Sequence, residues 1–165
     1  MTEIYVVSDT HFNHANILKF TGEDGKTFRN FRDVHEMNET MIENWNKVVT
    51  PQDKVYHLGD VFFGNEKEAE VILSRLNGKK RLIVGNHDHL KSPVLHKYFQ
   101  KIYMWRIFKE YGLLLTHVPV HEGSIRGGGI NVHGHIHQNT SPKGPYKCVC
   151  VEHTNYTPVN IEGLR

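Results

Sequence analysis

The chain has 165 residues, of which 38% are hydrophobic and 23% are charged. This length and composition are typical of one globular domain with one sizeable core, so we expect residues 1–165 to form a single domain. The net charge of +2 neither requires nor excludes a nucleic-acid partner. No apolar run approaches the roughly 20 residues of a membrane-spanning helix, so we expect no membrane partner. The oligomeric state does not follow from these features.

The two cysteines indicate a reducing compartment. Cys148 and Cys150 are separated by one residue, and a disulfide between residues so close in an extended segment would be badly strained. The amino terminus also lacks the basic and apolar pattern of a signal peptide. We therefore expect reduced thiols and a cytoplasmic location.

The first half of the chain alternates between strands and helices. The clearest helix is residues 33–49, where apolar side chains recur on one face and where Asp33 and Glu36 resemble a capping box. Around it we predict strands at 4–7, 54–58 and 82–84, a second amphipathic helix at 66–76, short helices at 13–20 and 93–99, and an exposed loop at 21–30.

The second half consists mainly of strands that follow one another directly. We predict them at 102–109, 112–116, 130–133, 146–151 and 158–161. Alternating elements followed by consecutive strands predict an α/β fold, in the form of an α/β/β/α sandwich of two mixed sheets flanked by helices. The glycine-rich stretch 122–129 lies between two polar motifs, and we expect it to form a rim of the functional site.

Five of these strands end in polar side chains. Histidine is also unusually common, with 13 residues dispersed along the chain. Open α/β sheets bind ligands at the carboxyl ends of their strands, and histidine, carboxylate and amide groups bind divalent metals. The pattern therefore predicts a metal centre built from these motifs: Ser8-Asp9-Thr10-His11, Gly59-Asp60, Gly85-Asn86-His87-Asp88, Thr116-His117 and His133-Gly134-His135-Ile136-His137.

In this order, the motifs resemble those of the calcineurin-like metallophosphoesterase superfamily. The resemblance spans Asp9 to His137 and is closest to the small, single-domain bacterial and phage members that lack a cap domain. It implies the same sandwich fold and the hydrolysis of phosphate esters by hydroxide that a dinuclear metal centre activates. Seven ligand-type side chains are also too many for one tetrahedral ion, which independently favours two metals.

The resemblance assigns the ligands of two divalent ions, which we expect to be Mn²⁺, Fe²⁺ or Zn²⁺, with Mn²⁺ favoured. Asp60 is expected to bridge the ions. Asp9, His11 and His137 complete the first site, and Asn86, His117 and His135 complete the second.

The resemblance also implies a catalytic pair. His87 is expected to protonate the leaving group or stabilise charge on it, and Asp88 is expected to orient the His87 ring. Three further residues are candidate substrate contacts. His14 is either a substrate contact or a supporting residue, and Arg29 and Arg32 either bind phosphate or form a solvated pair. His57 is expected to be a hydrogen-bonded core residue.

The sequence is compatible with three functions. We favour a metal-dependent phosphoesterase, and a phosphodiesterase in particular, because an uncapped cleft admits both arms of a diester. A nuclease that acts on DNA or RNA is an alternative, although no additional nucleic-acid-binding segment is visible. A metal-binding scaffold of the same fold without turnover is another. The expected partner is a phosphoester substrate, with a nucleotide among the candidates.

Overall fold

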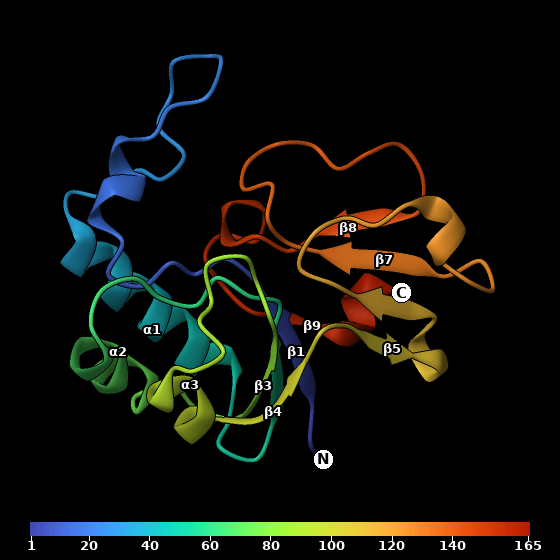
Figure 1. Cartoon of the computed structure of the whole chain (residues 1–165), viewed down its shortest axis with the longest axis horizontal. Coiled ribbons are helices and arrows are strands. Elements are labelled where there is room, and N and C mark those ends of the chain that lie inside the picture. The colour runs from blue at the N-terminus through green and yellow to red at the C-terminus, as the bar shows by residue number, and fades with distance from the viewer.

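The structure, a computed structural model, describes residues 1–165. Three α-helices and two β-sheets make up its body, and Figure 1 shows how they are arranged. The helices are α1 (Val34–Val48), α2 (Glu66–Leu73) and α3 (Pro93–Tyr98). The strands are β1 (Ile4–Val7), β2 (Lys54–His57), β3 (Lys79–Ile83), β4 (Phe99–Tyr103), β5 (Arg106–Phe108), β6 (Leu113–Leu115), β7 (Ile130–His133), β8 (Tyr146–Cys148) and β9 (Val159–Asn160).

Both sheets are mixed. The first has the strand order β4-β3-β2-β1-β9, in which β1 to β4 are parallel and β9 is antiparallel to β1. The second has the order β5-β6-β7-β8, in which β5 is antiparallel and the other three strands are parallel. The prediction of two mixed sheets with flanking helices is confirmed.

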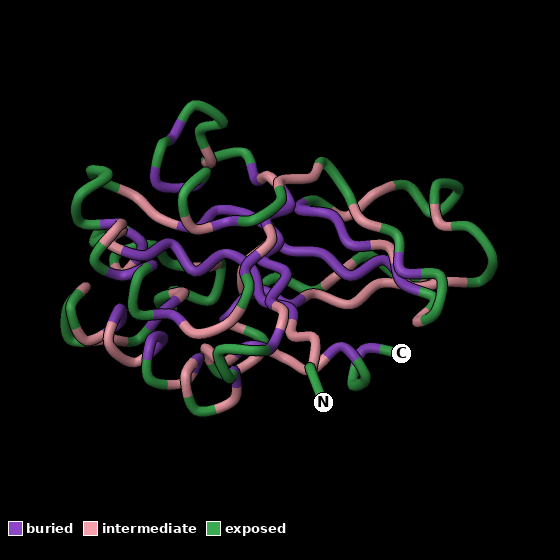
Figure 2. The backbone as a smooth tube through the Cα atoms, turned by 90° about the horizontal axis from the view of Figure 1, so that it is seen from below, coloured by how far each residue is buried: buried purple, intermediate pink, exposed green.

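The core has two layers because successive strand residues point to opposite faces of a sheet. Val7, Val55 and Leu82 face the helices, where they pack with apolar residues of α1 such as Trp45. Their neighbours Val6, Tyr56 and Ile83 face the second sheet and pack there with the inner residues of β6 and β7. Buried backbone therefore runs through the centre of the molecule, with exposed turns around it (Figure 2). Figure 1 shows α1, α2 and α3 on the side of the first sheet that faces away from β7 and β8.

Several predicted bounds are wrong. Residues 102–109 do not form one strand, because the chain leaves the first sheet after β4 and enters the second at β5. The connection contains the exposed residues Met104 and Trp105. The strand predicted at 146–151 ends at Cys148 and is followed by a 3₁₀ helix, Val151–His153. The short helix predicted at 13–20 is likewise a 3₁₀ helix, Ala15–Lys19.

The expectation that residues 122–129 form a rim of the site is also wrong. This stretch precedes β7 and therefore lies at the amino end of that strand, whereas the polar motif follows its carboxyl end. Residues 124–127 and Gly129 line a hollow together with Gly112 and Leu113 at the start of β6.

The carboxyl ends of the central strands meet at one edge of the molecule. Residues Val7 and His57 are partners in the pairing of β1 with β2, so the loops that follow these strands leave at the same level. Those loops also bond to each other, since the backbone N–H of Asp9 donates to Gly59 O over 3.0 Å and that of His11 donates to Asp60 O over 3.1 Å. None of the helices is long and apolar enough to cross a bilayer.

Candidate metal centre and active site

Two groups of acidic and histidine side chains lie at this edge. Within each group, the candidate ligand atoms are no more than 4.8 Å from one another. Asn86 adjoins the second group, since its Oδ1 lies 2.8 Å from His117 Nε2 and 3.0 Å from His135 Nδ1. The first group is Asp9, His11 and His137, and the second is Asp60, His117 and His135.

The separations between these donor atoms are within a few tenths of an ångström of those between atoms that share a cation. Atoms about 2.1 Å from one ion lie about 3.0–3.4 Å apart in octahedral or tetrahedral geometry. His11 Nε2 lies 3.5 Å from Asp9 Oδ1, and His135 Nδ1 lies 3.3 Å from His117 Nε2. Asp60 Oδ2 is 3.6 Å from His11 Nε2 and 3.4 Å from His117 Nε2, so one carboxylate oxygen faces both groups.

Close backbone approach holds the two carboxylates in place. Asp60 Oδ1 accepts a hydrogen bond of 2.9 Å from the His87 backbone N–H, which leaves Oδ2 for the ligand position. A Cβ on Gly85 would collide with Asp60 Oδ1, and a Cβ on Gly134 would collide with Asp9 Oδ2. Glycine is therefore required at both positions for the loops to reach the carboxylates.

The ligand positions also carry most of the unusual backbone conformations. Eight residues other than glycine have a positive φ, and five of them are predicted ligands. This left-handed region costs free energy for ordinary residues, and such strain concentrates at functional sites. The five are Asp9 at 57°, His11 at 48°, Asp60 at 57°, His135 at 73° and His137 at 51°.

The residues fit a pair of divalent ions. Asp9 Oδ1 and both ring nitrogens of His11 are buried without a hydrogen-bond partner. An unsatisfied buried polar atom costs about 1–3 kcal/mol, and a cation at the first group would remove that cost. The mixed set of carboxylate, imidazole and amide donors suits borderline and hard divalent ions.

The electrostatics also favour a cation. Burial raises the pKa of the Asp9 and Asp60 carboxyls, but the neighbouring His11 and His117 rings outweigh it and bring both pKa values below the ordinary range. Burial lowers the pKa of His117, but the Asp60 and Asp9 carboxylates raise it to about 9. Both carboxyls are therefore anionic at neutral pH. The negative potential that raises the pKa of His117 also attracts a metal cation.

Hydrogen bonds fix the orientation of the histidines. His117 Nδ1 donates to Leu58 O over 2.7 Å, which directs Nε2 into the second group. His137 Nδ1 donates to Glu152 Oε2 over 2.9 Å. Metal-binding histidines commonly have such a carbonyl or carboxylate partner.

Glu152 was not predicted from the sequence. Its side chain is only 2% exposed and forms an ion pair of 3.2 Å with Arg29 Nε. A signal was present, because the strand predicted at 146–151 runs directly into Glu152, as the other five strands run into their polar motifs.

Neither alternative for Arg29, a phosphate contact or a solvated residue, matches its position in the structure. Its side chain is fully buried and donates to the backbone carbonyls of Asp9 and Thr10 as well as to Glu152. Arg29 thus lies behind the first group and supports it. Arg32 is 76% exposed and lies near Asp33 and Glu36 at the start of α1, an arrangement that matches the alternative of a solvated residue.

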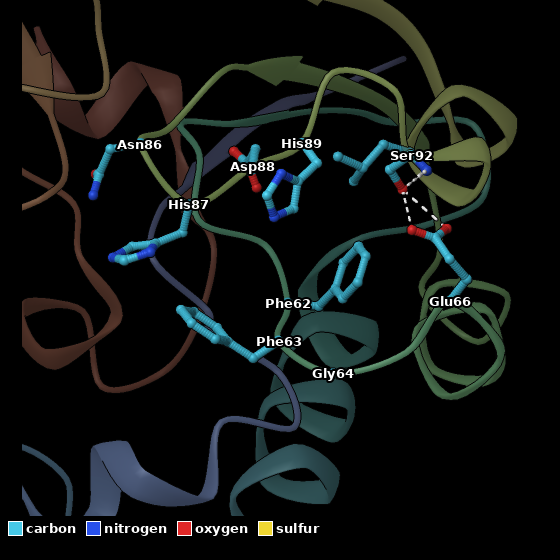
Figure 3. Close-up of a pocket in the computed structure, with 10 residues that line it drawn as sticks. Phe62, Phe63, Gly64, Glu66, Asn86, His87, Asp88, His89 and Ser92 are labelled. Carbon is cyan, nitrogen blue, oxygen red and sulfur yellow. Dashed lines mark hydrogen bonds between the residues drawn. The ribbon is translucent and has the colours of Figure 1, made fainter.

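His87 lies next to both groups without belonging to either. Its ring centroid is 5.9 Å from that of His11 and 5.0 Å from that of Phe63. The expectation that Asp88 orients this ring is wrong, because the two side chains point in different directions (Figure 3). The Asp88 carboxylate instead accepts the backbone N–H groups of Asp60, Val61 and Gly85, and so holds the loops that carry the ligands.

Two other histidines have defined surroundings. His14 stacks on Phe63 with a centroid distance of 3.9 Å and lies 5.5 Å from the His11 ring. Burial and neighbouring positive charge lower the pKa of His14 to about 4, so the ring is neutral at pH 7. His57 is a buried, hydrogen-bonded residue as expected, with Nε2 2.9 Å from Thr10 Oγ1.

The two groups of ligand-type side chains, together with a match to a protein family, support a metal-dependent phosphoesterase. The sequence model of the calcineurin-like phosphoesterases matches residues 2–160, and the chain belongs to this family.

The relatives are small proteins of similar length. The uncharacterized protein MJ1445 of Methanocaldococcus jannaschii is 38% identical, with 98% of this chain and 89% of that protein covered. The gene 66 protein of Mycobacterium phage L5 is 30% identical over 83% of this chain and 78% of its own length. The crystal structure of AQ665 from Aquifex aeolicus, a protein of unknown function, has a TM-score of 0.76 and 29% identity, and the match covers 99% of this chain and 98% of that one.

Proposed function

We propose that this protein is a phosphodiesterase with a dinuclear centre of divalent metal ions, Mn²⁺ being favoured. The observation that carries the proposal is the position of Asp60 Oδ2, which lies within 3.6 Å of a ligand nitrogen from each group. One carboxylate placed in this way suits a bridge between two ions. We also propose that residues 1–165 act as one domain without a cap, and the free cysteines support a cytoplasmic location.

The metal ligands and His87 have different roles in the proposed hydrolysis. When bound, two divalent ions supply Lewis acidity that makes a water more acidic and neutralises charge on the phosphoryl oxygens. Asp9, Asp60 and Asn86 would bind the ions through their side-chain oxygens. His87 lies outside the ligand groups and would act on the substrate. In hydrolysis, the water oxygen forms a bond to phosphorus, the bond to the leaving oxygen breaks, and His87 donates a proton to that oxygen.

A diester fits the surroundings of the centre better than a monoester. A monoester carries nearly two negative charges at neutral pH, and fixed cations near the terminal oxygens would favour it. Arg29 is buried behind the first group, and Arg32 lies near carboxylates of α1. In contrast, Asn86, His87 and His135 are exposed, which leaves room for a second ester arm.

The proposal is tested with purified protein and Mn²⁺. We expect bis-p-nitrophenyl phosphate to be hydrolysed with a higher kcat/KM than p-nitrophenyl phosphate, and a chelator to abolish both activities. Asp60→Asn should remove activity because it weakens the bridge. A preference for the monoester would refute the diesterase assignment. Absence of turnover with both metals bound would favour the scaffold, and cleavage of an oligonucleotide would favour the nuclease.

A further inference from the structure

A pocket of about 210 Å³ adjoins the candidate centre (Figure 3). The loop after β2 supplies Phe62 and Phe63, and the loop after β3 supplies His87 and His89. The far end is formed by Glu66 at the start of α2 and by Ser92, the N-cap of α3. His87 thus belongs both to the wall of this pocket and to the surroundings of the two ligand groups.

The lining determines what the pocket accepts. Aromatic and imidazole rings form much of its wall, and such rings stack with planar ligands. None of the lining residues is lysine or arginine, whereas two, Glu66 and Asp88, are acidic. A second phosphate would be repelled here, while an uncharged planar ring would not.

The acidic end is held rigidly. Glu66 Oε1 and Oε2 accept hydrogen bonds from Ser92 Oγ over 2.7 and 3.0 Å, and Oε2 also accepts from the Val94 backbone N–H over 2.9 Å. These hydrogen bonds fix the position of the carboxylate, whose oxygens can also accept N–H donors from a ligand. The volume is below the 300–1,000 Å³ of pockets that enclose whole drug-sized ligands, so it suits one ring system rather than a complete nucleotide.

The position of His87 indicates which part of the substrate enters. A residue that protonates the leaving oxygen must lie beside the group that carries this oxygen. On the proposed function, the leaving group therefore extends past His87 into the pocket. We infer that the pocket is a leaving-group subsite for an uncharged planar ring, so that the preferred substrates are phosphodiesters whose leaving alcohol is a nucleoside.

Binding of a free nucleoside tests the subsite without relying on catalysis. The probe is adenosine, titrated into ¹⁵N-labelled protein loaded with diamagnetic Zn²⁺ and followed by amide chemical shifts. We expect saturable shifts at Phe62, His89 and Ser92. Ribose 5-phosphate, which has the sugar and a phosphate but no base, should leave these signals in place. Stronger shifts with ribose 5-phosphate than with adenosine would contradict the inference and indicate an anion site.

Three variants make the test specific. His89→Ala changes an exposed side chain and Phe62→Leu a half-buried one, and each should weaken adenosine binding by about 10-fold or more, the scale of lost base stacking. Trp105→Leu, an exposed aromatic residue outside the pocket, should leave the affinity unchanged. Turnover of bis-p-nitrophenyl phosphate without adenosine binding would overturn the subsite alone. Adenosine binding at the pocket without any turnover would leave a nucleoside-binding pocket, but it would refute the phosphodiesterase and with it the role of the pocket as a leaving-group subsite.

Discussion

Among the residues of the site, His87 has the proposed role that can best be tested without changing metal binding. It is exposed and holds none of the ligand positions. We expect His87→Gln to lower kcat by about 10²–10⁴-fold on diesters with poor leaving groups, because proton donation is lost. The loss should be smaller with p-nitrophenolate, which leaves readily without a proton, and the metal content should not change. Steady-state kinetics with both substrate types decide this, and equal losses would mean that His87 only positions the phosphoryl group.

Two arginines in one loop should differ sharply in their effect on stability. Arg29 is buried against Glu152, so Arg29→Met removes the permanent positive charge beside a buried carboxylate and should lower the free energy of unfolding by about 3–5 kcal/mol. Arg32→Met is the matched control, since its exposed side chain should contribute no more than about 0.5 kcal/mol. Urea unfolding of the metal-free proteins measures both. Similar values for the two variants would contradict the supporting role of Arg29.

The second residue of strand β3 is a lysine that the fold buries. Lys80 is 6% exposed and its Nζ donates to Leu76 O over 2.7 Å and to Gly78 O over 3.1 Å. Burial lowers the pKa of Lys80 to about 8. Between pH 8 and the ordinary lysine pKa near 10.4, the native state therefore binds fewer protons than the unfolded state, and stability gained from this residue rises with pH.

The matching measurement compares wild type with Lys80→Met. The difference in the free energy of unfolding, wild type minus variant, should rise by at most about 1.4 kcal/mol per pH unit between pH 8 and 10. Lys79→Met, on the exposed neighbour in the same strand, serves as the control. A difference for Lys80→Met that stays constant across this range would show that the ammonium is not desolvated.

The elements that position the site were predictable where a buried run ends abruptly in polar residues. Val6-Val7 before Asp9 and Val132-His133 before His135 carry this signal, and the structure brings these motifs together. The split of residues 102–109 was not predictable, because apolar character continues through Met104 and Trp105 while the chain changes sheets. Local sequence also does not encode that Arg29 points inward, since its partner Glu152 lies 123 residues away.

In the whole molecule, the candidate metal centre lies where the two sheets meet. Each group of ligands takes side chains from both sheets: Asp9 and Asp60 follow β1 and β2 of the first, whereas His117 and His137 follow β6 and β7 of the second. Metal binding would therefore link the sheets as well as supply the chemistry. Because Asp60 faces both groups, the centre should bind two ions together rather than at independent sites.

Anomalous scattering from crystals of the Mn²⁺-loaded protein, together with elemental analysis in solution, tests the dinuclear centre directly. Two manganese peaks should appear about 3.5–4 Å apart with the Asp60 carboxylate between them, and the solution should hold two ions per chain. Asp60→Asn should lower the occupancy of both peaks, because the bridge contributes to each site. A single ion, or two ions with Asp60 in contact with neither, would contradict the proposed dinuclear centre.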